Sequence, residues 1–387
     1  MQQESKNAEI VVVGHVTEVY GPVQALENYL KEKKADFLFI TVPFAYCSVE
    51  RASAQRYIAG EKVGESGGPR NPIVKKLYGV YYVRGAFFTL LQVMKRGRTK
   101  GVYVGIDNLN AFLGLLLKKA GFVDKVVYYV IDYTKKRFLL GMFNRLYHAI
   151  DRICVKHADY VWNISSRIAV VRESQGVPAS KNLIVPVGVE LEKIARCGDP
   201  DRNKHILVAV SHLTESKGVQ LIIEVLAETK KVLPDMQIHI IGTGPYESAL
   251  RELAKVKKVE QDVRFLGPMA HDELFRYLPR CGVALATYTE NPNNITYYAD
   301  PTKPKEYLAC GLPVIITRVP WIAELIEKTP MGIAINYDRE DLKKAIVRLM
   351  TDDSFHNACR ANALRYAAQL SWGDIYDRAC RMSGIAI

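Results

Sequence analysis

The chain has 387 residues, of which 49% are hydrophobic and 24% are charged, and its formal net charge is +12. This composition is typical of a globular protein and excludes disordered, collagen-like and low-complexity classes. The length suits two domains, each large enough to bury its own hydrophobic core.

The residues before Ile10 lack the basic and apolar regions of a signal peptide. No stretch approaches the eighteen or so uninterrupted apolar residues that a membrane-spanning helix requires. We therefore expect a cytoplasmic protein. The seven cysteines are scattered, form no CxxC pair and have no clustered histidines beside them, so we expect reduced thiols and no metal site.

Strand-like apolar runs alternate with helix-like amphipathic segments in both halves of the chain. In chain order, the predicted strands are residues 10–13, 37–42, 102–106, 126–131, 160–163, 206–210, 238–241, 263–266, 283–286 and 314–316. Such alternation is typical of parallel sheets covered by helices. It predicts an α/β protein with two doubly wound, Rossmann-like domains.

A polar stretch at residues 196–204, which contains Gly198 and Pro200, predicts the boundary between the domains. We expect an N-terminal domain at 1–198 and a C-terminal domain at 199–370. Residues 371–387 are helical in pattern and are expected to cross back onto the first domain. Because open parallel sheets bind ligands at the carboxyl ends of their strands, we expect the two domains to face one another across a cleft.

Four motifs in the second half follow predicted strand ends. They are a loop with Ser211, His212 and Lys217, the pair Gly242 and Gly244, a turn at Gly267, and a segment with Asp300, Lys303 and Glu306. A lysine beside a helix N-terminus suits a phosphate, and glycine lets the backbone approach a ligand closely. Taken singly, a surface lysine and ordinary glycine turns remain open interpretations.

Lys303 and Glu306 share one helix face if a helix begins near Pro304, a residue favoured at the first helical position. A lysine there can neutralise phosphate charge. A glutamate there can accept two hydrogen bonds from ribose hydroxyls. The alternative is an internal salt bridge between the two side chains.

The order of these motifs over residues 206–372 closely resembles the donor-binding half of retaining GT-B glycosyltransferases, especially family 4. The resemblance implies the GT-B fold and metal-independent transfer from a nucleotide-sugar substrate, a UDP- or GDP-sugar, without a cofactor. It also implies that Lys217 binds the donor pyrophosphate, that Gly267 lies along the nucleotide, and that Glu306 holds the ribose.

Two positions depart from the family pattern. Ser211 and His212 stand where family 4 members commonly have Gly-Arg, and Tyr298 stands where they commonly have a second glutamate. A neutral His212 would supply less positive charge than an arginine. Asp300 and Lys303 resemble the substitute used in the subgroup whose motif reads DPxK.

The first half resembles the family less strongly. Gly21 matches a glycine loop before the first helix, and Asp132 matches the aspartate of a His-Asp pair in which Ile131 replaces the histidine. The resemblance makes Asp132 a catalytic candidate together with Lys217 and Glu306. Three further candidates for the acceptor site or cleft are His15, Asp107 and Arg137. A structural ion pair between Asp132 and a neighbouring cation is an equal alternative.

The positive charge is concentrated in the first half. Residues 1–200 carry 29 Lys and Arg against 18 Asp and Glu, whereas residues 201–387 carry 24 against 23. Residues 51–100 alone hold 11 basic and 2 acidic side chains beside an aromatic, apolar run. This combination favours contact with an anionic membrane surface, with a solvated basic face and nucleic acid as the alternatives.

We expect a glycosyltransferase that acts on a glycan or a lipid-linked acceptor and does not bind nucleic acid. Two alternatives stay open: a nucleotide-sugar 2-epimerase on the same scaffold and a basic nucleic-acid-binding protein. An epimerase would convert a nucleotide-sugar without any acceptor. A nucleic-acid-binding protein would show steep salt dependence and no turnover of donor.

Overall fold

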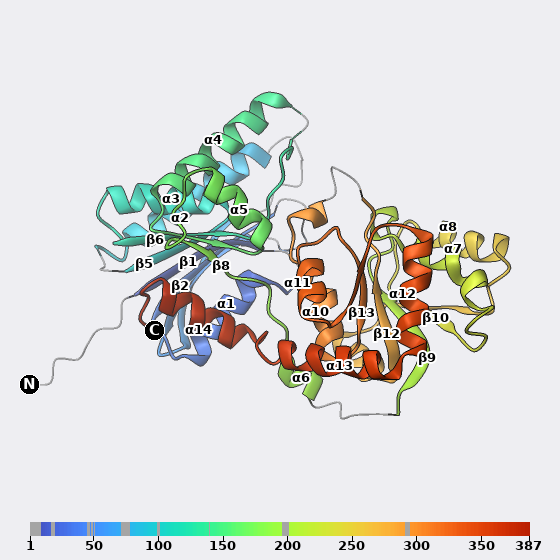
Figure 1. The fold of residues 1–387 in the computed structure, drawn as a ribbon. Helices are drawn as coiled ribbons and strands as arrows, with labels where there is room; N and C mark the ends of the chain where they lie inside the picture. Colours follow the sequence, from blue (N-terminus) through green and yellow to red (C-terminus); the bar gives the residue numbers. More distant parts are fainter. Residues whose placement is uncertain are drawn as a thin grey trace, which may run out of the picture. The chain divides into compact units, whose positions relative to one another are not determined.

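The computed structural model describes residues 9–16, 20–44, 47, 49, 51–70, 78–98, 101–138, 140–195, 201–290 and 295–387. Contacts between Cα atoms divide the chain into two units (Figure 1). Unit 1 comprises Met1–Val187 and Trp372–Ile387, and unit 2 comprises Gly188–Ser371. The sequence predicted a boundary at 198/199, so the observed division falls eleven residues earlier, at Val187/Gly188.

The described part of unit 1 contains an eight-stranded sheet. Its strands, in spatial order, are β4 (Glu61–Arg70), β3 (Arg51–Ile58), β2 (Phe37–Pro43), β1 (Ile10–Val16), β5 (Val102–Ile106), β6 (Lys125–Val130), β7 (Tyr160–Asn163) and β8 (Asn182–Ile184). The six strands from β2 to β8 are parallel, whereas β3 and β4 form an antiparallel edge. The central strands are buried on both faces, which explains their continuous apolar runs.

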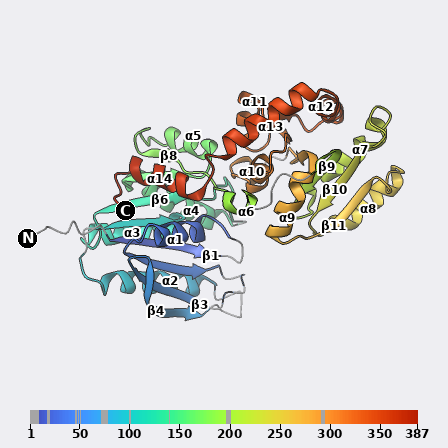
Figure 2. The ribbon, with the colours of Figure 1, turned by 90° about the horizontal axis from the view of Figure 1, so that it is seen from below.

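Helices cover both faces of this sheet (Figures 1 and 2). On one face, α1 (Pro22–Glu32) packs against α14 (Trp372–Met382), and their apolar side chains share one core cluster. On the other face, α2 (Tyr78–Met94) packs on α3 (Asn108–Lys119), which packs on α4 (Gly141–His157). The short helix α5 (Ser166–Ser174) follows β7.

The C-terminal segment is held on unit 1 by specific hydrogen bonds. The hydroxyl of Tyr376 donates to the carbonyl of Pro22 at 2.8 Å, and the hydroxyl of Tyr29 donates to Asp377 at 2.6 Å. The indole N–H of Trp162 donates to Ser383 Oγ at 2.8 Å. These bonds fix α14 against α1 and the end of β7.

Unit 2 contains a six-stranded, fully parallel sheet in its described residues. Its strands, in spatial order, are β11 (Val263–Gly267), β10 (Gln237–Ile241), β9 (Asn203–Val210), β12 (Cys281–Ala286), β13 (Val314–Thr317) and β14 (Gly332–Ile335). Its α-helices are α6 (Leu191–Ala195), α7 (Val219–Thr229), α8 (Glu247–Val256), α9 (His271–Tyr277), α10 (Thr302–Ala309), α11 (Ile322–Lys328), α12 (Arg339–Thr351) and α13 (Asp353–Ala367). Two core clusters, one on each face, bury the sheet.

The predicted strands are present, and four others escaped prediction: β3, β4, β8 and β14. Strands β3 and β4 form a hairpin whose turn has positive φ angles at Ala59 (49°) and Gly60 (80°). Because β4 is exposed along most of its length and contains glycine and proline, it lacks the apolar run that marks a strand. No helix in the described residues combines the length and the apolar character that crossing a membrane requires.

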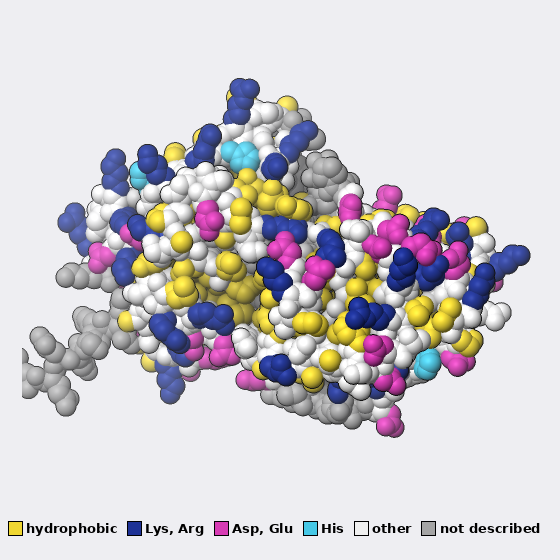
Figure 3. Space-filling view, viewed as in Figure 1, with side chains coloured by type: hydrophobic (Ala, Val, Ile, Leu, Met, Phe, Trp, Pro, Cys, Tyr) yellow, Lys and Arg dark blue, Asp and Glu magenta, His cyan; other side chains and the backbone are white. Residues whose placement is uncertain are grey.

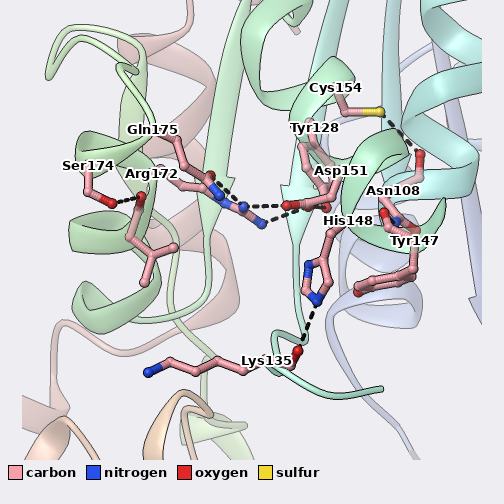
Figure 4. A network of polar contacts seen from close by, with 11 residues as sticks. Asn108, Tyr128, Lys135, Tyr147, His148, Asp151, Cys154, Arg172, Ser174 and Gln175 are labelled. Carbon is pink, nitrogen blue, oxygen red and sulfur yellow. Dashed lines mark hydrogen bonds and ion pairs between the residues drawn. The ribbon is translucent and has the colours of Figure 1, made fainter. Parts of the chain in front are cut away.

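A buried ion pair joins three elements of unit 1 (Figure 4). Asp151 on α4 accepts two hydrogen bonds from the guanidinium of Arg172 on α5, at 2.6 and 2.9 Å, and a third from the hydroxyl of Tyr128 on β6 at 2.6 Å. Both charged side chains are almost fully buried. The bidentate geometry compensates for the loss of their hydration and fixes α4 relative to the sheet.

The same helix carries the loop that follows β6. The amide of Asn144 donates to the carbonyl of Lys135 at 3.2 Å, and a ring nitrogen of His148 lies 3.0 Å from the same carbonyl (Figure 4). Asn108, at the start of α3, donates to the carbonyl of Tyr147 at 3.1 Å. The position of α4 therefore determines where residues 131–138 and the start of α3 lie.

We expect Asp151→Asn to lower the free energy of unfolding by about 3–5 kcal/mol, because it leaves the guanidinium of Arg172 buried without a countercharge. Denaturant unfolding followed by circular dichroism measures the change. The exposed pair Lys62–Glu65 provides the matched control, since Glu65→Gln should change stability little. Equal effects of the two substitutions would contradict a structural role for the buried pair.

Candidate functional site

A pocket lies at the carboxyl end of β9 in unit 2. It is lined by Ala209, Val210, Ser211, Lys217, Val219, Leu285, Ala286, Thr287, Tyr288 and Tyr307. Two predicted site residues, Ser211 and Lys217, are therefore brought together here. The walls come from β9, β12, α10 and the start of α7, which begins at Val219 as the sequence predicts.

Lys217 carries a charge that its surroundings do not neutralise. Its Nζ lies 5.3 Å from the centre of the Tyr288 ring, and no carboxylate of the described residues lies within ion-pair distance of it. Burial lowers the pKa of Lys217. A partly buried ammonium without a carboxylate partner, just before a helix N-terminus, is suited to an anionic ligand.

The loop that carries Lys217 packs tightly against the chain after β12. Gly218 has a φ of 70°, and a Cβ there would overlap the carbonyl oxygen of Thr287. The hydroxyl of Thr287 donates to the carbonyl of Gly218 at 2.9 Å. Only glycine fits both the left-handed backbone and this close approach, so Gly218 fixes the position of its neighbour Lys217.

Ser211 and His212 differ in their surroundings. The hydroxyl oxygen of Ser211 is buried and has no hydrogen-bond partner within the described residues. An unsatisfied buried hydroxyl is costly unless a ligand or water completes it. His212 is exposed, and it does not line the pocket.

The predicted glycines bring three loops together. The N–H of Gly242 donates to the carbonyl of Gly267 at 2.8 Å, and a Cβ at Gly242 or Gly244 would overlap the backbone of the loop after β9. At Gly267, by contrast, an added Cβ would meet no atom within 4 Å. Gly242 and Gly244 thus serve loop packing, and open space lies beside Gly267.

Glu306 lies on α10, which begins at Thr302, two residues before the predicted start. Its carboxylate is only 3% exposed; it accepts a hydrogen bond from Lys303 Nζ at 2.8 Å and lies 3.9 Å from His271 Nε2. The structure therefore contains the salt bridge that the sequence left as an alternative. The charge of Lys303 is compensated by Glu306 in this structure.

Asp300 is engaged in a buried ion pair with Lys305. Its second oxygen accepts a hydrogen bond from the indole N–H of Trp321 at 2.9 Å. Both carboxylate oxygens are therefore occupied by protein groups, which is the pattern of a residue that positions α10. The sequence pointed to Lys303 as the cation of this motif, whereas the structure pairs Asp300 with Lys305, two residues further along.

Tyr307, Tyr288 and His271 were missed by sequence reasoning. The N–H of Val210 donates to the hydroxyl oxygen of Tyr307 at 2.7 Å, which ties α10 to the end of β9. His271 lies between the carboxylates of Glu306 and Glu190. Tyr307 follows Glu306 directly in the sequence, but no local signal distinguishes its role from that of an ordinary core tyrosine.

His15, near the end of β1 in unit 1, is a neutral side chain. Its Nδ1 lies 2.9 Å from the carbonyl of Val42, and its ring stacks on Phe44. Because a carbonyl can only accept, Nδ1 carries the proton and Nε2 is left as an acceptor. Burial, with a smaller contribution from the charge of Arg137, lowers the pKa of His15 to about 4.

Asp107 follows β5 and has φ 74° and ψ 159°, a conformation that non-glycine residues rarely adopt. Burial raises its pKa to about 7, with Arg137 opposing the rise and Asp132 adding to it. The described residues provide no hydrogen bond to its carboxyl group. Asp107 is thus a strained, unpaired carboxyl group at the carboxyl end of a central strand.

Asp132 and Arg137 form an ion pair at 2.6 Å in the loop after β6, so the structural alternative for Asp132 is present. Nearby charges, those of Tyr147 and Asp132 foremost, raise the pKa of Arg137 against the opposing effect of burial. Gly21 has an extended φ of −159° and caps α1, and its N–H donates to Gln24 at 3.1 Å. Its left-handed freedom is therefore not used.

No group of three or more His, Cys, Asp or Glu side chains in the described parts of the chain is arranged to hold a metal ion. The charged groups described above are distributed over several loops. Their grouping suits organic ligands with phosphate and hydroxyl groups.

Comparison with known proteins places unit 2 in a known context. Residues 204–352 match the family described as Glycosyl transferases group 1. The chain is similar to the Alpha-monoglucosyldiacylglycerol synthase of Streptococcus pneumoniae, with 26% identity over 181 residues, which are 43% of this chain and 39% of that protein. It is also similar to the D-inositol 3-phosphate glycosyltransferase of Corynebacterium jeikeium, with 25% identity over 247 residues, 57% of each chain. The match thus spans about half or less of these relatives.

Among solved structures, HepE of Anabaena in complex with UDP matches with a TM-score of 0.70 and 15% identity, over 97% of this chain and 99% of that chain. At this identity, the likeness shows the fold. The chain has the GT-B fold, as predicted, and its unit 2 carries a Glycosyl transferases group 1 domain.

Asp107 should make stability fall as pH rises from about 4 to about 7. Its pKa is about 7 in the folded chain and about 4 in an unfolded one, so in this window the folded state keeps a proton that the unfolded state has lost. Asp107→Asn removes this effect. We expect the stability of wild type relative to D107N to fall by on the order of a few kcal/mol across the window and to level off above it.

Denaturant unfolding of both proteins at several pH values measures this difference. His15 contributes with the opposite sign, because its lowered pKa makes stability rise with pH between about 4 and 6.5. Both proteins carry His15, so its contribution cancels in the comparison. Parallel pH profiles for wild type and D107N would contradict a raised pKa at Asp107.

Proposed function

We propose that the chain is a retaining, metal-independent glycosyltransferase of family 4 that moves a sugar from a nucleotide-diphosphate sugar to a glycan or lipid-linked acceptor. The domain match at residues 204–352 and the named relatives favour sugar transfer over the epimerase and nucleic-acid alternatives. The observation that carries the proposal is the pocket at the end of β9. There the Lys217 ammonium lacks a carboxylate partner and the Ser211 hydroxyl lacks a hydrogen-bond partner within the described residues.

In this proposal the donor diphosphate lies against Lys217 and the first N–H groups of α7, and its ribose lies against Glu306. The helix dipole and the ammonium favour the same negative charge. Ser211 supplies a hydroxyl for a phosphate oxygen, and the open space beside Gly267 accommodates the nucleotide. UDP- and GDP-sugars are the expected donors; the solved HepE structures contain UDP and UDP-glucose.

The chemical step breaks the bond between the anomeric carbon and the donor phosphate oxygen. The acceptor hydroxyl attacks on the face that the nucleotide leaves, which retains the configuration, and its proton passes to the departing phosphate. Negative charge grows on the leaving group during this step. Lys217 and the N-terminus of α7 are already in place to stabilise that charge, so no reorganisation is needed when it forms.

The acceptor side of the proposal rests on the polar side chains at strand ends in unit 1. Asp132 is retained as a catalytic candidate, and His15, Asp107 and Arg137 as candidates for acceptor binding. His15 offers a neutral acceptor nitrogen, and Asp107 offers an unpaired carboxyl group. Both suit hydroxyl groups of a sugar. The names of the relatives, which include a diacylglycerol glycoside synthase and an inositol phosphate glycosyltransferase, support glycan or lipid-linked acceptors.

Lys217→Ala should abolish stabilisation by nucleotide while leaving the unliganded protein almost as stable, since Lys217 makes no ion pair that the fold would lose. A panel of UDP, GDP and ADP in a thermal unfolding assay identifies the base, because a ligand that binds only the folded state raises the midpoint. At about a hundredfold excess over the dissociation constant, the stabilisation is about 2.7 kcal/mol. Lys217→Arg should restore only part of it.

The matched control is Lys230→Ala, which removes a partly exposed lysine that pairs with Asp262 elsewhere in unit 2. This variant should keep the full nucleotide response. A K217A protein that responds to nucleotide as wild type does would remove Lys217 from the site.

Glu306→Gln should lower transfer at least a hundredfold with saturating donor and EDTA present throughout, because a misoriented ribose misplaces the reacting carbon. Lys303→Gln is the matched control: it breaks the same ion pair but leaves the carboxylate in place. It should retain at least a tenth of wild-type transfer. If the two variants lost activity equally, the ion pair and not ribose binding would explain Glu306. Wild-type activity that disappears in EDTA and returns with Mg²⁺ or Mn²⁺ would overturn metal independence.

A further inference from the structure

The outward face of α2 is apolar. Its large exposed side chains are Val80, Val83, Phe87, Leu91 and Met94, with exposed fractions from 38% to 70%. These positions are three or four residues apart and therefore form one stripe along the helix. The opposite face, which includes Tyr81 and Val93, is buried against the sheet. A surface helix normally turns polar residues outward, yet the only charged residue of α2 is Arg84.

A second apolar surface begins after Arg137 and continues onto α4. Its exposed members are Phe138, Leu140, Met142, Phe143, Leu146 and Ile153. Met142 and Leu140 are 71% and 64% exposed. The buried side of α4 is occupied by Asp151, Cys154 and Val155, so the apolar stripe points away from the protein interior. Nothing in the sequence singled out this segment, because its apolar residues look like core positions.

Both surfaces belong to one layer of unit 1, because α2, α3 and α4 cover the same face of the sheet and pack side by side (Figures 1 and 2). Leu109 and Leu116 add exposed apolar side chains on α3. Of the twenty-five exposed large hydrophobic side chains in the described residues, thirteen lie on α2, on α3 or in residues 138–153. Such concentration marks an interaction surface rather than scattered exposure.

Basic side chains accompany this layer. Between residues 131 and 157 the exposed cations are Lys135, Lys136, Arg145, Arg152 and Lys156. The acidic residues of this stretch are Asp132 and Asp151, and both are committed to ion pairs with arginines. Figure 3 shows Lys and Arg side chains along the upper edge of unit 1, where α3 and α4 lie. The surface is therefore apolar and positively charged.

We propose that the outer face of the α2–α3–α4 layer lies on an anionic lipid bilayer, with the apolar side chains inserted among the headgroups and the cations at the lipid phosphates. A helix lying in the interface needs this combination of an apolar face and flanking cations. Nucleic acid would leave Leu140, Met142 and Leu146 without a use. A second copy in a two-fold dimer would bring the same cations of both copies together.

The structure also revises which part of unit 1 makes this contact. From the sequence, residues 51–100 were expected to carry it. Lys75 and Lys76 lie outside the described residues, and Arg96 pairs with Glu9. Of that region the proposal keeps α2 and Arg84, and it adds α4 with the segment that precedes it.

The test is flotation with vesicles of phosphatidylcholine alone and of phosphatidylcholine with phosphatidylglycerol. Wild type should float with the anionic vesicles, and its partition coefficient should fall as salt rises because the Debye length shrinks from ~10 Å at 0.1 M to ~3 Å at 1 M. An apolar variant, L140S/M142S/L146S, and a basic variant, K135Q/R145Q/R152Q, should each lower the partition coefficient at least tenfold. All six side chains are exposed, so both variants should fold.

A matched variant in unit 2, V232S/V256S/K255Q, changes side chains of similar exposure and should float as wild type does. Met142→Cys and Val232→Cys, each labelled with an environment-sensitive fluorophore, locate the contact: only the first should shift to the blue with anionic vesicles. The proposal fails if wild type does not float, or if the two α4 variants float as wild type does. It also fails if the L140S/M142S/L146S change dissolves a dimer or weakens DNA binding instead of vesicle binding.

Discussion

The hydroxyl of Tyr307 connects the two halves of the donor pocket in unit 2. It accepts a hydrogen bond from the N–H of Val210 and lies close to the carbonyl of the same residue, so the end of β9 and α10 are held in a fixed relation. Every polar group of the pocket depends on this relation. Ser211 follows Val210 directly, Glu306 precedes Tyr307 directly, and Lys217 is held by the tight contact of Gly218 with Thr287.

Around the pocket, charged residues divide into those that hold the protein together and those left for a ligand. Asp300 and Lys305 neutralise one another in the interior and receive a further hydrogen bond from Trp321. Their burial would be costly without this pairing. Because these groups are satisfied internally, α10 is rigid, and Lys217 remains as a cation without a carboxylate partner in the described residues. Rigid placement of charge is what electrostatic stabilisation of a leaving group requires.

Unit 1 combines the same kind of internal anchor with an unusual exterior. The Asp151–Arg172 pair fixes α4 against the sheet, and through Asn144 and His148 it also fixes the loop that carries Asp132 and Arg137. The outward side of this helix is apolar and flanked by cations. One helix therefore supports a polar cluster at the strand ends and a lipid-facing surface, which is a consistent arrangement for an enzyme whose acceptor is amphiphilic.

The sequence alone determined the α/β class, the two doubly wound units and the order of the unit 2 motifs, because continuous apolar runs and glycine loops are local signals. It could not determine which charges pair: Lys303 with Glu306 and Asp300 with Lys305 differ by only two positions, and helix geometry selects between them. Nor could it show that Met142 is exposed while Tyr81 is buried. An apolar residue has the same identity on either face, and only the packing of neighbouring elements decides which face is covered.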